Sequence, residues 1–161
     1  MKEIRQLKAI GACSEATDWL KTQPGWQTAW DKCEQGDWML WLLGKLSGDP
    51  NSPERKHFVL VTCQCARLAL PYVTKGERRP LKTIEIAEAW ARGEPGITLQ
   101  DVRAAAAAAY AAAYAAANAA ANAAAYAAAE AAANAAKRTE GLKQCADIVR
   151  QAYPDAPQVT K

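Results

Sequence analysis

The sequence predicts an all-α protein, a compact helical bundle built around one long alanine-rich helix. Residues 104–136 are nearly pure alanine, without proline or glycine, and alanine is the best helix former. Elsewhere, helix start and stop signals recur, whereas the alternating pattern of strands is missing. The length of 161 residues suits one domain with a core of its own. We therefore expect a single helical domain over residues 1–161.

The first part of the chain, residues 1–96, is predicted to form short helices. Ser14 is expected to cap the second helix, and Gly11 and Gly36 are expected to stop the first and third. The pair Pro24-Gly25 breaks the chain between the second and the third. The first three helices are expected over residues 2–10, 14–21 and 26–34.

The fourth helix is predicted over residues 38–43, with Asp37 as its cap. Its sequence, WMLWLL, is apolar on all sides. A helix without a polar face is buried on every side in a globular protein. We therefore expect it to be the most deeply buried helix.

Two further helices are predicted before residue 96. Ser52 is followed by a proline and an acid, which together favour a helix start. That helix is expected to end near Leu70, because Pro71 cannot continue it. Pro80 opens a second helix that is expected to run to Ala91, before a turn rich in glycine.

The long helix is predicted over residues 97–140. Thr98 and Asp101 have the spacing of a capping box, with Asp in place of the usual Glu. Counted from Leu99 to Glu140, the helix would be about 60 Å long. Gly141 is expected to end or bend it. A last helix is then expected over residues 141–153.

The non-alanine residues of this segment recur every fourth position, while a helix repeats every 3.6 residues. Each step therefore turns about 40° too far, and the marked side chains wind around the helix. Either the helix passes through the protein among different neighbours, or it pairs with a second copy. We expect a homo-oligomer, a dimer or larger. The marked residues are Tyr110, Tyr114, Asn118, Asn122, Tyr126, Glu130 and Asn134.

Composition argues against two classes of protein. The formal net charge of +3 is too small for nucleic-acid binding by bulk electrostatics. Alanine is too weakly apolar to drive membrane insertion, and polar residues interrupt the segment. The N-terminus lacks the apolar core of a signal peptide. The chain is therefore expected in the cytoplasm of a bacterial host cell, without a membrane partner.

Cysteine and histidine usage indicates neither disulfides nor a metal. The five cysteines are odd in number and scattered. Cys63 and Cys65 are about 200° apart around a helix, so they cannot hold one ion together. His57 is the only histidine. We expect buried thiols, no metal site and no cofactor.

Catalytic motifs are also missing. The sequence has no glycine-rich phosphate loop and no Gly-x-Ser-x-Gly elbow. His57 could pair with a cysteine, and Glu85 with Glu88, but lone histidines are more often structural and such acid pairs more often lie on solvated helix faces. We expect the protein not to be an enzyme.

Binding is the favoured class of function. The six tryptophans and five tyrosines offer planar contact surfaces for flat ligands. Arginine forks can hold phosphates or carboxylates. The alternative is that the tryptophans only fill the core and the arginines are solvated. The predicted ligand site comprises Asp37, Trp38, Trp41, Arg67, Glu88, Trp90, Tyr110, Tyr114, Asn118 and Asn122.

Four segments carry a family resemblance, together with the alanine–tyrosine repeat: WDKCEQGDWMLW (30–41), CARLALP (65–71), AEAWAR (87–92) and CADIVR (145–150). From about Trp30 to Arg150 the chain resembles the immunity-protein-5-like family of immunity proteins from bacteria and phages. The resemblance implies a small protein that neutralises something by binding it, and it supplies no catalytic residues.

Three functions remain open. The favoured one is a phage-type sponge, an anti-defence protein that sequesters a nucleotide-derived immune signal in an aromatic and arginine-lined pocket. The second is an immunity protein or inhibitor that binds and blocks a toxin or a defence effector. The third is an enzyme that degrades a nucleotide signal.

Overall fold

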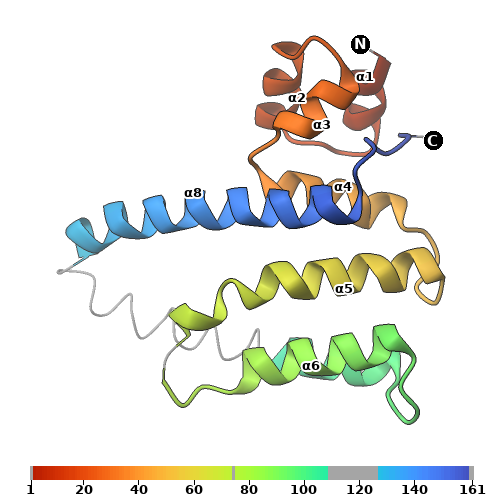
Figure 1. Ribbon diagram of the computed structural model, residues 1–161, viewed down its shortest axis with the longest axis vertical. Coiled ribbons are helices and arrows are strands. Elements are labelled where there is room, and N and C mark those ends of the chain that lie inside the picture. The colour runs from red at the N-terminus through yellow and green to blue at the C-terminus, as the bar shows by residue number, and fades with distance from the viewer. Residues whose placement is uncertain (1, 74, 109–126, 160–161) are drawn as a thin grey trace. The chain divides into compact units, whose positions relative to one another are not determined.

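A computed structural model describes residues 2–73, 75–108 and 127–159. Within these ranges the chain is helical and contains no strand, which confirms the all-α class (Figure 1). The elements are α1 (Lys2–Ala9), α2 (Ser14–Lys21), α3 (Trp26–Lys32), α4 (Gly36–Leu46), α5 (Pro53–Arg67), the 3-10 turn η1 (Leu70–Tyr72), α6 (Arg79–Arg92) and α8 (Ala127–Ala152).

The chain divides into two compact units. The first unit comprises Met1–Phe58 and Leu142–Lys161, and the second comprises Val59–Gly141. The divisions fall inside α5 and at Gly141 within α8. Each unit has its own buried residues, described below. Folding as one cooperative domain stays a prediction.

In the first unit, α1 contacts α2, and the start of α4 packs against the C-terminal turns of α8. Leu20, Met39, Ala146 and Val149 are almost completely buried. The start of α4 approaches α8 so closely that a Cβ atom added at Gly36 would lie 2.6 Å from the Cβ atom of Cys145. This contact leaves room for glycine alone.

In the second unit, the later turns of α5 pack against α6. The core cluster comprises Cys63, Ile84 and Ala87, with Val59, Leu70 and Val102 packed against it. Residues 99–108 are helical. The hydroxyl of Thr83 on α6 donates to the carbonyl of Ala105, at 3.0 Å, which ties these two helical segments together.

Two predicted helix starts are confirmed in atomic detail. The backbone N–H of Arg55 donates to the Ser52 hydroxyl at 3.1 Å, so Ser52 caps α5. The backbone N–H of Thr98 donates to the Asp101 carboxylate at 2.8 Å, and the N–H of Asp101 donates back to the Thr98 hydroxyl at 3.3 Å. This reciprocal pair is a capping box in which Asp replaces Glu.

Two other predicted caps are wrong. Cys13 precedes the first turn of α2, while the Ser14 hydroxyl donates to the Glu15 carboxylate instead. Helix α4 begins at Gly36, one residue before Asp37, and Gln35 takes the cap position. Gly36 therefore starts a helix rather than stopping one, because its missing side chain admits α8.

The predicted helix ends hold only in part. Helix α5 ends at Arg67, and the chain continues as η1, which contains the proline expected to end it. Helix α6 ends at Arg92, and the following Gly93 has φ +76°. Glycine adopts this left-handed conformation without the steric penalty of a side chain.

The alanine-rich segment is described at its two ends. Residues 109–126, which include the predicted site residues Tyr110, Tyr114, Asn118 and Asn122, lie outside the described residues. Helix α8 runs through Gly141 to Ala152, so the expected helix over residues 141–153 is the end of α8. Gly141 does not end the helix, because one glycine costs only about 1 kcal/mol and its neighbours are good helix formers.

In the ranges that the structure describes, no helix combines the length and the apolar character that a bilayer span requires.

Replacing Gly141 by Ala is expected to stabilise the protein by about 0.5–1 kcal/mol, because alanine has the higher helix propensity. The new Cβ atom meets nothing within 4 Å. Urea unfolding followed by circular dichroism measures the gain. Gly93→Ala is the matched control and should destabilise by about 1 kcal/mol, because φ is +76° there. A loss of stability in Gly141→Ala would contradict an unstrained helix at this residue.

Candidate functional site

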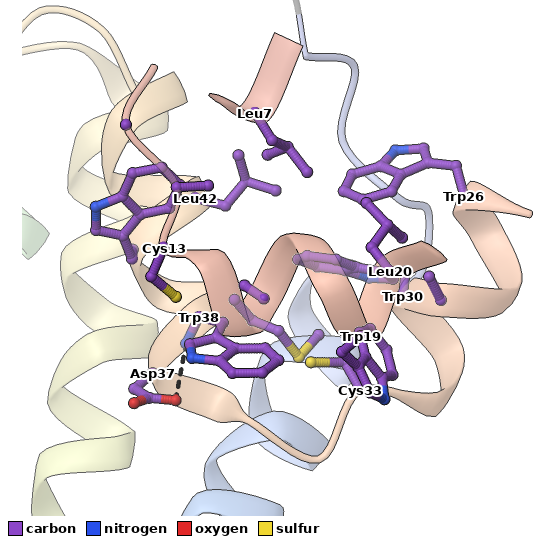
Figure 2. A pocket seen from close by; sticks show the side chains of 16 residues that line it. Leu7, Cys13, Trp19, Leu20, Trp26, Trp30, Cys33, Asp37, Trp38 and Leu42 are labelled. Carbon is purple, nitrogen blue, oxygen red and sulfur yellow. Dashed lines mark hydrogen bonds between the residues drawn. The ribbon is translucent and has the colours of Figure 1, made fainter. Parts of the chain in front are cut away.

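The first unit contains a cavity of about 430 Å³ between the short helices α1 to α4 (Figure 2). Its lining is almost entirely apolar. Five of the six tryptophans in the sequence contribute to it. They are Trp19, Trp26, Trp30, Trp38 and Trp41. A concave, mostly apolar cavity of this volume falls in the range of ligand-binding pockets. We call it the tryptophan pocket.

Short helices are what allow so many indoles to meet. Each of α2, α3 and α4 contributes one or two rings, because the connections at residues 22–25 and 33–35 redirect the chain after helices of only 8 and 7 residues. Trp19 on α2 and Trp38 on α4 touch with their ring centroids 6.1 Å apart and their planes tilted by 60° (Figure 2). Tilted pairs at this separation are favourable arrangements of aromatic rings.

The C-terminal tail holds two of these tryptophans from outside the pocket. The indole N–H of Trp26 donates to the carbonyl of Pro157 at 2.9 Å, and that of Trp30 donates to the carbonyl of Tyr153 at 2.8 Å. Between them, the Gln27 amide donates to the Pro154 carbonyl and accepts the N–H of Ala156. Both rings therefore present their apolar surfaces to the pocket while their polar atoms are satisfied elsewhere.

Among the described residues, the lining of the pocket includes one carboxylate and no basic side chain. Asp37 is exposed at its edge, and one of its oxygens accepts the backbone N–H of Trp38 at 2.9 Å (Figure 2). The ammonium of Lys45, which does not line the pocket, lies 5.7 Å from the ring centroid of Trp41. The described lining therefore carries one negative charge and no positive charge.

The thiol of Cys33 in the pocket wall is held in its neutral form. Burial raises its pKa above the usual value, the backbone hydrogen bond with Gln35 and the charge of Arg150 lower it, and the carboxylates of Asp37 and Glu34 add to the rise. A thiol is a poor nucleophile until it loses its proton. Cys33 therefore serves as an apolar surface.

Three other predicted site residues lie in the second unit. Arg67 on α5 donates through Nε and Nη2 to the two carboxylate oxygens of Glu88 on α6, both at 2.8 Å. Arg92 approaches the same carboxylate at 3.8 Å. The hydrogen bond from Arg67 holds the pKa of Glu88 below its usual value. Trp90 is buried in this unit. The Arg67 fork is thus already engaged by a carboxylate of the protein itself.

The structure therefore groups the predicted site residues in two places. Asp37, Trp38 and Trp41 line the tryptophan pocket. Arg67 and Glu88 form an ion pair in the other unit. Convergence of the two groups with Tyr110–Asn122 stays a prediction.

The predicted site did not include three tryptophans of the pocket: Trp19, Trp26 and Trp30. Trp30 is buried, and its ring also forms part of the pocket wall. The helix predicted as most deeply buried, α4, buries Met39, Leu42 and Leu43. Its half-buried Trp38 and Trp41 line the pocket together with Met39 and Leu42. One signal in the sequence could have identified these residues. Tryptophan recurs in predicted helices that are too short to bury the whole surface of each indole ring.

His57, which could pair with a cysteine, contacts an aromatic ring, and Cys63 is a buried thiol. The ring of His57 meets the ring of Tyr153 edge-on, with centroids 5.0 Å apart. Burial, with the charge of Glu88 adding to it, raises the pKa of Cys63 to about 11. No group of three or more metal-ligating side chains occurs among the residues that the structure describes.

Fold and site together define a small all-α protein with an aromatic pocket. The chain belongs to the family of Imm-5 like putative immunity proteins, whose family model matches residues 51–152. No curated protein matches the chain, and neither does any solved structure.

The family match and the pocket occupy different parts of the sequence. The match includes three segments of the resemblance, at residues 65–71, 87–92 and 145–150, but not the segment at residues 30–41. Every residue that lines the tryptophan pocket precedes residue 51. Family membership therefore does not by itself assign a role to the pocket.

Replacing Gly36 by Ala is expected to destabilise the protein by about 1–3 kcal/mol, the usual cost of overpacking. The added Cβ atom would meet Cys145 and the backbone nitrogen of Ala146 at 2.6 and 2.8 Å. Gly25→Ala is the control, since nothing lies within 4 Å there. Thermal unfolding compares the two variants. Equal stabilities would mean that α4 does not rest on α8.

Acid is expected to weaken the Arg67–Glu88 pair. Because the pKa of Glu88 is lowered in the folded state, its contribution to stability is complete above the unfolded pKa of about 4.5 and is lost as pH falls through the folded pKa. Between pH 6 and pH 3, wild type should lose more unfolding free energy than Glu88→Gln. Parallel pH profiles in urea unfolding would show that the pair contributes nothing.

Proposed function

We propose that this chain is a non-catalytic neutralising protein that binds a protein toxin or effector through the tryptophan pocket. The observation that carries the proposal is a pocket of about 430 Å³ lined by five tryptophans in a member of an immunity-protein family. Tryptophan is the residue most enriched among the energetic centres of protein interfaces. Four of the five rings are only half-buried, so they retain surface for a partner.

The charge of the pocket favours a protein over a nucleotide. A nucleotide brings phosphates, which need arginine, lysine or a helix N-terminus to hold them. The part of the lining that the structure describes contains one carboxylate and no basic residue. In the second unit, the Arg67 fork is occupied by Glu88, and Arg79 is paired with Glu77. The sponge for a nucleotide signal therefore becomes the alternative that the experiment must exclude.

The surroundings of the candidate nucleophiles support a function without catalysis. Cys33 and Cys63 are buried thiols whose pKa values are raised. At neutral pH both stay protonated, and a protonated thiol attacks poorly. The single histidine packs against a tyrosine ring. A binder that blocks its target by occupying it needs none of these groups.

A growth-rescue experiment tests the proposal. Bacteria that express members of a library of bacterial toxin domains are co-transformed with this chain, and survivors identify the neutralised domain. The purified pair is then measured by calorimetry. Trp38→Ala is expected to weaken binding at least tenfold, because truncating an interface tryptophan typically costs more than about 1.4 kcal/mol. Circular dichroism verifies that the variant is folded.

Lys82→Ala is the matched control, because Lys82 is an exposed residue of α6 outside the pocket. It should rescue growth as wild type does. Equal rescue by a folded Trp38→Ala protein would remove the pocket from the proposal. In parallel, the chain is incubated with cyclic dinucleotides and ADP-ribose-type signals, and bound material is released by heat. Intact recovered nucleotide would replace the proposal by the sponge, and altered nucleotide by the enzyme.

Self-association is a separate part of the proposal. An alanine-rich helix gains little from burial on its own, since each side chain hides only one methyl group. Pairing with a second copy would bury the alanine faces of the segment between residues 104 and 136. Light scattering of the purified chain measures its mass, and a monomer would contradict this part alone.

A further inference from the structure

We infer that the tryptophan pocket selects a partner segment in which an apolar anchor side chain lies next to a lysine or arginine. The inference rests on the proposed function and names the chemistry of the segment that enters. It follows from three features of the pocket: its apolar walls, its single carboxylate and the cation already bound on one of its rings.

The walls define the anchor. Leu7, Leu20, Met39 and Leu42 line the pocket together with the five indoles. Such a surface offers few hydrogen-bonding groups, because Trp26 and Trp30 donate theirs to the tail on the outside. A polar side chain entering the pocket would lose its water without gaining partners. A large aliphatic or aromatic side chain would instead gain from leaving water.

The carboxylate of Asp37 favours a positively charged residue next to the anchor side chain of the partner segment. Only one hydrogen bond to Asp37 is formed among the described residues, from the backbone N–H of Trp38, so the second oxygen stays available. No lysine, arginine or histidine in the described ranges lies within 4.0 Å of it. Glu34, the next acid towards the N-terminus, is instead paired with Lys143 at 3.3 Å. Asp37 is thus an unpaired charge at the edge of an apolar surface.

The negative field of Asp37 reaches the pocket wall. At Cys33 the charges of Asp37 and Glu34 both disfavour the thiolate and so raise its pKa, while Arg150 opposes them. Because Glu34 and Arg150 each have a partner of opposite charge, Asp37 is the carboxylate left to attract an incoming cation. An ammonium or guanidinium at the edge would meet this charge without being buried.

The indole faces add to the preference. Lys45 already lies over the ring of Trp41, with its ammonium 5.7 Å from the centroid, which is the separation of a cation–π contact. Its charge makes that side of the pocket less attractive to a second cation. Among the described residues, no cation lies over the ring of Trp38, which is next to Asp37 and against Trp19. The incoming charge is therefore placed beside Asp37 and Trp38.

Three probes of equal length test the inference: hexylammonium, hexanol and hexanoate at pH 7. Binding is followed by tryptophan fluorescence, to which the pocket contributes five of six indoles, and by ligand-observed NMR. Affinity should fall in the order in which the probes are named. Hexylammonium should bind about two- to fivefold more tightly than hexanol, as expected of one exposed ion pair. The difference should shrink in 1 M salt.

Asp37→Asn should remove the preference and leave the affinity for hexanol unchanged, since the amide oxygen can still accept the N–H of Trp38. Asp49→Asn is the matched control: it removes the same charge from an exposed loop position outside the pocket, and it should keep the preference. Equal affinities of the three probes for wild type, or binding of none of them, would overturn the inference. So would a preference that persists in Asp37→Asn.

The two proposals fail separately. Should the probes show the expected order while no toxin domain is neutralised, the chemistry of the pocket stands and the proposed function fails. Should a toxin be neutralised in a way that depends on Trp38 but not on Asp37, the proposed function stands and the cationic neighbour is wrong.

Discussion

The close approach of α4 to α8 at Gly36 is the contact on which the first unit depends. A helix can come this near to another only where a side chain is missing, and the contact sets where Trp38 and Trp41 project from α4. The carbonyl of Cys33, just before this point, accepts a hydrogen bond from Arg150 of α8. The Gly36 contact and this hydrogen bond thus both hold residues 33–36 against α8.

The tail continues the same arrangement on α3. After α8 ends, residues 153–159 lie along α3 and receive the indole N–H groups of Trp26 and Trp30, across sequence separations of 131 and 123 residues. Val159 is buried at the end of the tail. An indole whose N–H is satisfied on the outside can offer the rest of its ring to a cavity without an unpaired donor. The tail thus makes an apolar pocket compatible with tryptophan walls.

Local signals were predictable from the sequence because their partners lie within a few residues. The Ser52 cap and the Thr98–Asp101 box each involve atoms three residues apart, so the sequence alone specifies them. Gly36 was misjudged because its partner, Cys145, is more than 100 residues away. The fork of Arg67 was expected to be available for a ligand, yet Glu88 lies one helix away and engages it.

The sequence predicted the aromatic character of the candidate site but only some of its residues. Aromatic abundance indicated a flat, apolar binding surface, and Asp37, Trp38 and Trp41 do line the pocket. Which other indoles share it depends on how four short helices cross, and no residue pattern encodes those crossings directly. The predicted site therefore lacked Trp19, Trp26 and Trp30, which also line the pocket.

The boundary of the family match gives this arrangement a further meaning. The matched residues 51–152 include the turns of α8 that contact Gly36, whereas the pocket helices α1 to α4 all precede the match. Within the first unit, the residues that the family model matches thus form the turns of α8 on which α4 packs. The residues before the match form the described walls of the tryptophan pocket. Of the α4 side chains that line the pocket, Met39 and Leu42 are buried, whereas Trp38 and Trp41 are only half-buried. If the pocket binds a target as proposed, substitutions at Trp38 and Trp41 would change which target is recognised, while Gly36 and its packing against α8 are kept.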